Sequence, residues 1–508
     1  MRLLRLLAVG ACAGVNVSAQ TVNDPALRAV VVANGLHPVG PNSQICTGFG
    51  FVGPRTVLLT SRGTGKVLRV DLDPSGAAAQ PSGEALDLDI IAPANNDQQS
   101  EYGVQGIVLH PDFANNGWVY IRYDKSPNEG RDTPQSEVVL GPNFNASVPT
   151  QNVIERFVWD PSANGGSGAL VFDRLIHSLA VDTRYHHGGA PVFGPDGMMY
   201  VMYGNLRHEV WVPGHSGLLL SQNYPQPQGI VADYGTIVRL TDEGGVPADN
   251  PFLGLGAPDG TENWWAYGFR NSFGMAFDPR TGSLWCTDNG EDFFDELNLV
   301  TPRMNSGHIW ISGPINDPQQ VWGLGQLVML PGAEYRDPVY SWRATIGVTG
   351  LAFLSGSALG AAYENMILVG GVNAGVLRSF RLDGSRAALA TQASGAAEAV
   401  LGTGFGGTFR GVIAMGMGPD RLPYILTAAA QLIRLERAFC AGDVDGDGLV
   451  DSADLTAVVS NYQETGPGVA GDVNHDGAVD FLDLSAVLAE FGASCPAPPP
   501  AAPRGVKP

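Results

Sequence analysis

This chain of 508 residues lacks several features that would assign a class of protein directly. It has only 5 cysteines and no C-x-x-C pair, which argues against a zinc ribbon or a dithiol redox site. The short N-terminal apolar run cannot span a bilayer, and no other segment reaches the length that can. Basic residues are scarce, since 29 Lys and Arg face 50 Asp and Glu and the net charge is −21. This balance argues against a nucleic-acid partner.

The first residues predict export. The segment MRLLRLLAVGACAGVNVSAQ places Arg2 and Arg5 before an apolar run and small residues that end near Ala19, as in a secretory signal peptide. A lipoprotein site at Cys12 is a weaker alternative, because the apolar run before it is very short. We therefore expect a signal peptide at 1–19 and a soluble, secreted mature protein.

Four cysteines remain after export, and three disulfide pairings are open. They are Cys46, Cys286, Cys440 and Cys495. A clasp between Cys440 and Cys495 is the expected pairing, because these two residues bracket a small acidic module and a disulfide helps to hold a module with a small core.

Two acidic segments between those cysteines repeat one spacing. GDVDGDGLVDSADL begins at Gly442 and GDVNHDGAVDFLDL begins at Gly471. Counted as twelve-residue loops, both offer oxygen donors at positions 1, 3, 5, 9 and 12, glycine at 6 and a backbone carbonyl at 7, which suits Ca²⁺. The predicted ligands are Asp443, Asp445, Asp447, Leu449, Asp451 and Asp454 in the first loop, and Asp472, Asn474, Asp476, Ala478, Asp480 and Asp483 in the second.

An apolar, helix-like run follows each loop, LTAVVSNY in one case and LSAVLAEFG in the other, and no full helix precedes either loop. This order, with Asp rather than Glu at position 12, resembles the type I dockerin module. The resemblance implies that residues 437–496 attach the protein to a cohesin-like partner. A proline-rich tail at 497–508 follows.

Upstream, one unit recurs between about residues 45 and 436: an apolar strand, a turn built on Asp-Pro or Pro-Asp with Gly, and further strands rich in Tyr, Trp and Val. Six copies are recognised, of which GIVLHPDFANNGWVYIRY from Gly106 and GMAFDPRTGSLWCTDNG from Gly274 are among the clearest. Short strands and glycine-rich turns at this period are typical of propeller blades. We predict an all-β fold, a six-bladed β-propeller over 20–436, followed by a small α-helical dockerin with two EF-hand-like calcium loops. The stretches 126–151 and 206–232 are predicted loops on a propeller face.

Five further motifs occur in one order along this region. They are HPDF at His110, H-x-G-G-x-x-V-x-G-P-D-G from His186, VPADNPF from Val246, WAYGFRNSFGMAFDP from Trp265 and DNGEDFFDELNLV from Asp288. Together they resemble the soluble PQQ-dependent glucose and aldose sugar dehydrogenases, also called glucose/sorbosone dehydrogenases. The likeness covers nearly all of the propeller region and implies an oxidoreductase that oxidises a sugar at its anomeric carbon with PQQ and calcium.

The resemblance also implies roles for single residues. His186 matches the catalytic histidine that takes the hydroxyl proton while hydride passes to the quinone, and imidazole suits this because its ordinary pKa lies near working pH. Arg270 and Asn271 match a pair beside the cofactor, where a guanidinium stabilises negative charge on the quinone oxygens. From the residues alone, a structural role for His186, a catalytic role for His187 and a salt link by Arg270 remain open.

A calcium ion in this family is held partly by two consecutive backbone carbonyls, and these match Gly290 and Glu291. It polarises the quinone as a Lewis acid. Asp295 matches a carboxylate that reaches the ion through water, and Glu296 matches a position that binds a separate structural calcium in some relatives. Without the resemblance, DFFDELN is a polar turn before a strand.

The sequence differs from the family pattern at the positions that bind PQQ. PQQ carries three carboxylates, and the Lys and the Arg-x-Arg pair that clamp them in glucose dehydrogenases align with Asn373, Thr408 and Arg410. A Gln near the cofactor aligns with Glu101, and an acidic residue before the catalytic histidine aligns with Tyr185. Each charge-assisted contact counts for about 1.5–3 kcal/mol, so these departures weaken the predicted affinity for PQQ. Candidate replacements are Arg207, Arg343 and Arg378.

Two function classes follow. The first is a secreted aldose dehydrogenase that uses PQQ and calcium, passes electrons to an unknown acceptor and is tethered through its dockerin. The second is a carbohydrate- or protein-binding propeller that has lost PQQ, as in hedgehog-interacting-protein-like relatives. A hydrolase or lactonase is a third class, because a histidine beside calcium also activates water, but no Ser-His-Asp motif supports it.

Overall fold

The computed structural model describes residues 20–24, 26–36, 45–94, 100–137, 150–181, 183–206, 218–219, 230–317, 323–391, 396–405, 411–438, 442–445, 449–466, 469–474 and 476–493. The predicted signal peptide at 1–19, the tail at 497–508 and parts of both predicted propeller loops lie outside these ranges. So do several singled-out residues: Arg207, Thr408, Arg410, Cys440, Asp447 and Cys495.

The described strands form six sheets of four or more strands. In each sheet, four principal strands are antiparallel neighbours. The first three sheets consist of β3 (Cys46–Phe51), β4 (Thr56–Ser61), β5 (Lys66–Asp71) and β6 (Pro81–Asp87); β8 (Val104–Leu109), β9 (Trp118–Lys125), β11 (Thr150–Asp160) and β12 (Ala169–Val181); and β13 (Val192–Phe193), β14 (Met199–Tyr203), β17 (Thr236–Leu240), β18 (Trp264–Tyr267), β22 (Met304–Asn305) and β23 (Glu334–Tyr335).

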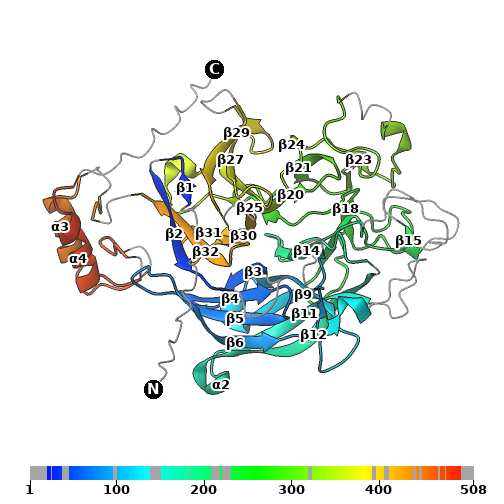
Figure 1. The fold of residues 1–508 in the computed structure, drawn as a ribbon. Helices are drawn as coiled ribbons and strands as arrows, with labels where there is room; N and C mark the ends of the chain where they lie inside the picture. The colour runs from blue at the N-terminus through cyan, green and yellow to red at the C-terminus, as the bar shows by residue number, and fades with distance from the viewer. Residues whose placement is uncertain are drawn as a thin grey trace, which may run out of the picture.

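The other three sheets complete the series, and Figure 1 shows the sheets following one another around a common centre. They consist of β19 (Met275–Phe277), β20 (Leu284–Asp288), β21 (Phe293–Val300) and β24 (Tyr340–Ala344); β25 (Val348–Phe353), β26 (Met366–Gly371), β27 (Leu377–Leu382), β28 (Leu389–Ala390), β29 (Glu398–Thr403) and β1 (Thr21–Val22); and β30 (Val412–Met417), β31 (Pro423–Thr427), β32 (Gln431–Arg437) and β2 (Leu27–Ala33). The predicted all-β propeller is confirmed.

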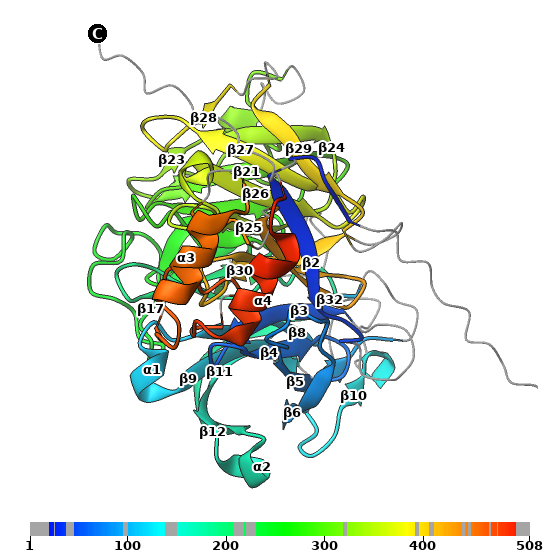
Figure 2. The same ribbon diagram turned by 90° about the vertical axis from the view of Figure 1, so that its left-hand side faces the viewer.

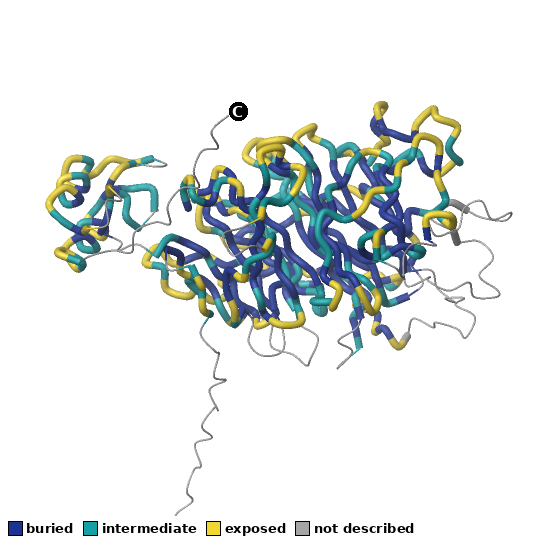
Figure 3. Tube along the Cα trace, turned by 90° about the horizontal axis from the view of Figure 1, so that it is seen from above, coloured by how far each residue is buried: buried dark blue, intermediate teal, exposed yellow. Residues whose placement is uncertain are grey.

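Short elements connect or flank these sheets. Two parallel pairs join β7 (Ile91–Ala92) to β10 (Thr133–Pro134) and β15 (Leu218–Leu219) to β16 (Ile230–Val231). The short helical turns are α1 (Phe113–Asn116), α2 (Ala163–Gly166), η1 (Gln135–Glu137), η2 (Gly323–Gln326) and η3 (Ala361–Tyr363). Figure 3 shows buried residues gathered inside the sheets and exposed residues on the outer turns. Among the described residues, no helix is long and apolar enough to cross a membrane.

The N-terminal strand β2 closes the ring of sheets. It pairs antiparallel with β32, with Leu27 opposite Arg437 and Val31 opposite Ile433. The two ends of the propeller region therefore meet in one sheet (Figure 1).

The repeated turn of the sequence has a repeated structure. In GPDG, Asp196 accepts a bond from the Tyr200 hydroxyl at 2.9 Å and pairs with Arg239 at 2.9 Å. In GPDR, Asp420 accepts a bond from the Tyr424 hydroxyl, also at 2.9 Å. The aspartate thus fixes the tight turn to the second strand of its sheet, which explains why Pro-Asp and Tyr recur together in the sequence.

The C-terminal module is a separate pair of helices. α3 (Ser452–Ser460) and α4 (Phe481–Glu490) lie side by side (Figure 2). Their shared apolar core is formed by Val450, Val458, Val479 and Val487, which occupy equivalent positions of the two repeats. The predicted helical module after the propeller is confirmed. Both helices begin earlier than the apolar runs suggested, because an aspartate before each one caps its first turn.

Candidate active site

The predicted catalytic residues come from segments that precede the innermost strands of neighbouring sheets. Glu101 precedes β8, His186 precedes β13, and Arg270 and Asn271 precede β19. The segment after β20 supplies Gly290. Glu101, His186, Arg270 and Asn271 thus stand at the starts of innermost strands. Because β20 runs antiparallel to β19, its end lies beside the start of β19, and Gly290 comes to the same end of the propeller.

His186 is buried and its backbone has a φ of 57°, in the left-handed region that most residues avoid. Its Nδ1 lies 2.5 Å from Oδ1 of Asn205. The Nδ2 of Asn205 in turn lies 2.8 Å from Nε2 of His308. The backbone N–H of Asn205 donates to the carbonyl of Arg270 at 2.8 Å, so one asparagine connects the predicted base to the predicted Arg-Asn pair.

The neighbouring His187 has a different environment. Its Nδ1 lies 3.0 Å from Asp124 and its Nε2 lies 2.8 Å from the carbonyl of Thr183. Burial acts to lower its pKa, but the charge and hydrogen bond of Asp124 outweigh burial and raise the pKa above its ordinary value. Both ring nitrogens of His187 are therefore engaged inside the protein.

Glu101 joins two parts of the site. Its Oε1 accepts a bond from Nδ2 of Asn271 at 2.8 Å, and its Oε2 accepts a bond from the backbone N–H of His187 at 2.7 Å. The Oδ1 of Asn271 also accepts a bond from the N–H of Gly188 at 3.2 Å. The carboxylate therefore holds the segment after His186 against Asn271.

Asp288 anchors the Arg-Asn pair through its backbone. Its two carboxylate oxygens accept bonds from the N–H groups of Arg270 at 2.9 Å and of Asn271 at 2.6 Å. The guanidinium of Arg270 donates to the carbonyl of Asn289 at 3.1 Å. Burial raises the pKa of Asp288 to about 6, against the opposing effect of these backbone bonds.

The segment predicted to hold the propeller calcium packs tightly on the next strand. Gly290 is half-buried and a Cβ there would meet the carbonyl of Phe293 at 2.0 Å, so only glycine fits; Glu291 is exposed. Asp295 is buried, and its oxygens accept bonds from the N–H groups of Gly290 at 3.0 Å and Ile346 at 2.7 Å. Asp295 therefore shapes the segment that carries the two predicted carbonyl ligands.

A second buried carboxylate follows. Glu296 accepts bonds from the N–H of Gly313 at 2.6 Å and from Nδ2 of Asn298 at 3.0 Å. Burial, reinforced by the charge of Asp288, raises the pKa of Glu296 to about 8.

Among the residues that the structure describes, the set of basic side chains expected to bind the carboxylates of PQQ is incomplete. Asn373 is exposed, and Thr408 and Arg410 lie outside the described ranges. Arg343 pairs with Asp317 at 2.5 Å, and Arg378 pairs with Glu398 at 2.7 Å. Both candidate replacements are thus engaged by carboxylates, and Arg207 is not described.

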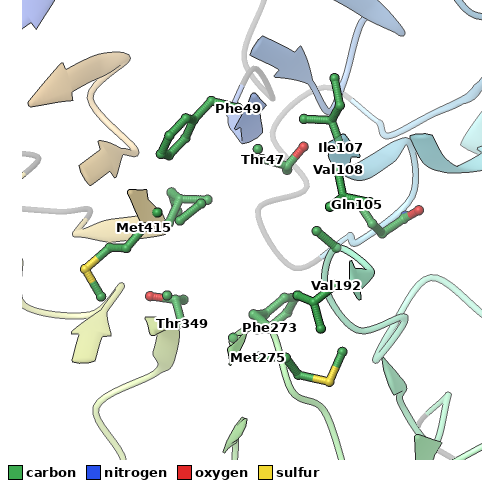
Figure 4. Close-up of a pocket in the computed structure, with 18 of the residues that line it drawn as sticks. Thr47, Phe49, Gln105, Ile107, Val108, Val192, Phe273, Met275, Thr349 and Met415 are labelled. Carbon is green, nitrogen blue, oxygen red and sulfur yellow. The ribbon is translucent and has the colours of Figure 1, made fainter. Parts of the chain in front are cut away.

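A cavity of about 610 Å³ runs along the innermost strands β3, β8, β13, β19, β25 and β30. Figure 4 shows apolar side chains on its wall, among them Phe49, Ile107, Met275 and Met415. Polar lining residues such as Thr349 and Thr47 bond within the protein, Thr349 to the carbonyl of Val412 at 2.6 Å and Thr47 to the carbonyl of Val104 at 2.9 Å. Glu101 lines this cavity and also bonds to Asn271 of the site.

Sequence reasoning missed a buried polar network under the site. Arg122, fully buried, donates to the carbonyls of Gly189 at 2.8 Å and Met202 at 2.6 Å and also contacts the carbonyl of His187. The signal was present, because Arg122 and Asp124 interrupt the apolar strand WVYIRYDK. Asn205 and His308 carried no comparable signal, since a single Asn or His in a loop is ordinary.

In the C-terminal module, the residue at position 12 of each predicted calcium loop organises the loop. Asp454 accepts bonds from the N–H groups of Val444 at 2.5 Å and Asp451 at 2.8 Å. Asp483 accepts the equivalent bonds from Val473 at 2.7 Å and Asp480 at 2.8 Å. Both aspartates are fully buried.

The predicted calcium ligands converge most clearly in the first loop. The carboxylates of Asp443, Asp445 and Asp454 offer oxygens within 4.8 Å of one another. In the second loop, Asp472 accepts bonds from the N–H groups of Asp476 and Gly477 at 3.1 and 3.0 Å. Asp451 and Asp480 also cap the helices that follow, a role that counting ligands did not predict.

The two cysteines that the structure describes are compatible with the expected pairing of Cys440 with Cys495. Cys46 and Cys286 are buried and unpaired. Neither of them therefore takes part in a disulfide, whereas the predicted clasp between Cys440 and Cys495 concerns residues that the structure does not describe.

Comparison with known proteins identifies both parts. Residues 46–431 match the glucose/sorbosone dehydrogenase family, and residues 441–491 match the dockerin type I domain. The uncharacterized protein slr1608 of Synechocystis is 27% identical over 427 residues, which are 82% of this chain and 87% of that protein. The quinoprotein glucose dehydrogenase B of Acinetobacter calcoaceticus is 26% identical over 269 residues, or 51% of this chain and 49% of that protein. The chain thus spans about half the length of that relative.

Solved structures share the fold. The PQQ-bound aldose sugar dehydrogenase of Streptomyces coelicolor superposes with a TM-score of 0.55 at 22% identity, covering 82% of this chain and 99% of that chain. The family match spans more than half of the sequence. The chain therefore belongs to the glucose/sorbosone dehydrogenase family, and a type I dockerin domain follows its propeller.

Proposed function

We propose that this protein is a secreted aldose dehydrogenase that oxidises a sugar at its anomeric carbon with PQQ and calcium. We also propose that each of its six larger sheets is a propeller blade. The observation that carries the proposal is the linked set of His186, Asn205, Arg270 and Asn271, held at one end of the central cavity. A buried histidine in a left-handed backbone conformation is costly to maintain, and such strain concentrates at functional sites.

The donors at the reacting end suit an ortho-quinone with a calcium ion. Arg270 and Asn271 supply N–H donors, and the segment of Gly290 and Glu291, fixed by Asp295, supplies carbonyl oxygens of the kind that Ca²⁺ prefers. These residues would hold the quinone oxygens and the ion; Asn373, Thr408 and Arg410 would face the carboxylates. The bound quinone would supply the hydride acceptor.

The protein residues perform the remaining steps. His186 accepts the proton of the sugar hydroxyl, while Asn205 keeps its ring in place. Arg270 would stabilise negative charge that develops on the bound ligand. Glu101 and Asp288 hold Asn271 and the backbone of Arg270, so these groups need little reorganisation when the ligand binds.

The dockerin has a separate role. We propose that its two loops bind Ca²⁺ and that the ordered module docks to a cohesin-like partner outside the cell. Buried Asp454 and Asp483 support this, because each combines a predicted calcium ligand with the hydrogen bonds that close its loop.

A binding propeller without PQQ remains the second candidate, and a specific observation favours it. Arg343 and Arg378 are engaged by Asp317 and Glu398, and Glu101 adds a negative charge near the place of a trianion. Such a protein would keep the fold and bind carbohydrate or protein without oxidation.

Reconstitution decides between these candidates. The purified protein is incubated with micromolar PQQ and Ca²⁺, and bound-quinone absorbance and sugar-dependent dye reduction are measured. We expect both signals, and His186→Gln should lower turnover by about 100-fold or more while leaving the absorbance. As a control, His110→Gln alters a histidine that bonds to Asn116 on an outer turn, and should retain activity. Absence of both signals in the wild type would leave the binding propeller as the function.

A further inference from the structure

Two buried polar atoms next to the site have no hydrogen-bond partner among the described residues. They are Nδ1 of His308 and Oγ of Ser306. Both residues line one small cavity, together with Asp288 and Glu296. Its volume of about 10 Å³ suits a single water molecule. Because a buried polar group without a partner is destabilising, one water bonded to both atoms would stabilise this region.

The walls of the cavity determine how such a water is oriented. Both oxygens of Asp288 accept bonds from N–H groups, so this side chain presents acceptors to the cavity. A water that donates a proton to this wall has its lone pairs available for His308 and accepts a bond from Nδ1–H. His308 itself is neutral, because burial and then the charge of Arg270 lower its pKa well below the ordinary value. A neutral ring protonated at Nδ1 has an acceptor at Nε2.

The tautomer of His308 then determines the tautomer of His186 through the side-chain amide of Asn205. The Nε2 of His308 accepts from Nδ2 of Asn205 at 2.8 Å, which turns Oδ1 of Asn205 toward Nδ1 of His186 at 2.5 Å. A carbonyl oxygen at that distance accepts only from a protonated nitrogen. His186 therefore carries its proton on Nδ1 and its lone pair on Nε2, the form that accepts a proton from a substrate.

We propose that His308, held in one tautomer by a single buried water, is a positioning residue that keeps His186 protonated at Nδ1. The opposite tautomer of His308 would rotate the Asn205 amide and leave the His186 proton on Nε2, where the ring is a donor and not a base. A metal ion in the small cavity would have that opposite effect, because it would bind the lone pair of Nδ1 of His308. The catalytic consequence rests on the proposed dehydrogenase function, but the tautomers exist without turnover.

The first test measures the tautomers directly. Protein labelled with ¹⁵N-histidine is examined by long-range ¹H–¹⁵N NMR at neutral pH, with His186→Gln and His308→Gln used to assign the two rings. We expect His308 and His186 both to be protonated at Nδ1 and bare at Nε2. Protonation of either ring at Nε2 alone would overturn the proposal.

The second test uses substitutions that separate positioning from packing. His308→Gln places an amide oxygen near the former Nε2 and should keep the His186 tautomer, whereas His308→Met has no such acceptor and should give a mixture of tautomers. If sugar oxidation is established, His308→Met should lower kcat about tenfold or more with KM little changed, and His308→Gln should restore most of it. Equal behaviour of both variants in the NMR spectrum would overturn the proposal. Absence of sugar oxidation would contradict the proposed function and leave the tautomer result to stand alone.

Discussion

At the scale of single residues, Glu101 combines a structural contribution with an electrostatic disadvantage. Its two oxygens accept bonds from Asn271 and from the backbone of His187, so the carboxylate holds two parts of the site together. The same negative charge opposes the binding of an anionic cofactor. The two effects have opposite signs and a single substitution separates them.

We predict that Glu101→Gln lowers stability and raises affinity for PQQ. The glutamine keeps one acceptor, but its NH₂ group faces a donor, so about 1–2 kcal/mol of unfolding free energy should be lost. Removal of the charge should tighten PQQ binding at least several-fold. Urea unfolding and PQQ titration measure the two quantities on the same sample. A variant that loses both stability and affinity would show that the carboxylate is needed mainly to shape the site.

We also predict a pH dependence that originates at His187. Because Asp124 raises the pKa of His187 in the folded state above its ordinary value of 6.5, the folded protein holds a proton that the unfolded chain releases. This stabilisation is fully present below about pH 6.5 and is lost as the pH rises through the folded pKa. The unfolding free energy of the wild type minus that of His187→Gln should therefore shrink between pH 6 and pH 9. A difference that stays constant would mean that His187 is neutral when folded.

The sequence identified part of this residue-scale arrangement. The motifs that contain His186, Arg270 and Asn271 predict these residues, and the fold brings their segments together. The sequence did not indicate Asn205, His308 or the buried pair of Arg122 and Asp124. Their positions depend on contacts between different sheets, and a linear pattern of strands and turns contains no information on which loops meet.

At the scale of elements, the calcium loops and the helices that follow them form one unit. Asp451 and Asp480 cap α3 and α4, and Asp454 and Asp483 complete the capping boxes. Spacing in the sequence predicts the calcium ligands without any structural knowledge, and the structure brings the carboxylates of Asp443, Asp445 and Asp454 together. The sequence placed the helix starts too late, because an aspartate was counted as a calcium ligand and its capping role was overlooked.

We predict that loop closure and helix capping are lost together. In Asp454→Ala/Asp483→Ala, the N–H groups bonded to both carboxylates lose their acceptors, so the far-UV circular dichroism of the module should no longer respond to Ca²⁺. Each lost cap adds about 0.5–2 kcal/mol of destabilisation. Sugar-dependent dye reduction should stay within about twofold of wild type, because the propeller has its own predicted calcium site. Asp454→Asn/Asp483→Asn keeps acceptors for the caps and should retain helix content at low calcium. If the alanine variant still shows the full calcium response, the predicted ligand set is wrong.

At the scale of the whole molecule, stability depends on closing the ring of sheets. The sequence repeats predicted a propeller, but they did not predict that β2 would supply the outer strand of the last sheet. That segment, LRAVVVA, has no turn motif or partner strand nearby in sequence. Its partner β32 is about 400 residues away, as the separation of 408 positions between Arg28 and Glu436 shows.

We predict that apolar contacts, more than the ion pair, hold this closure. Leu27 and Val32 are buried in the core that also contains Ile433, so Leu27→Ala should cost about 2–5 kcal/mol in the unfolding of the propeller. Arg28 lies beside Leu27 and pairs with Glu436 at 2.6 Å, but its side chain is 52% exposed, so Arg28→Ala should cost about 0–1 kcal/mol. Urea unfolding followed by tryptophan fluorescence compares the two variants. Equal and small losses would mean that β2 is dispensable. A large loss confined to Leu27→Ala would mean that buried apolar side chains, and not the ion pair, hold a strand near the start of the chain to strands some 400 residues later.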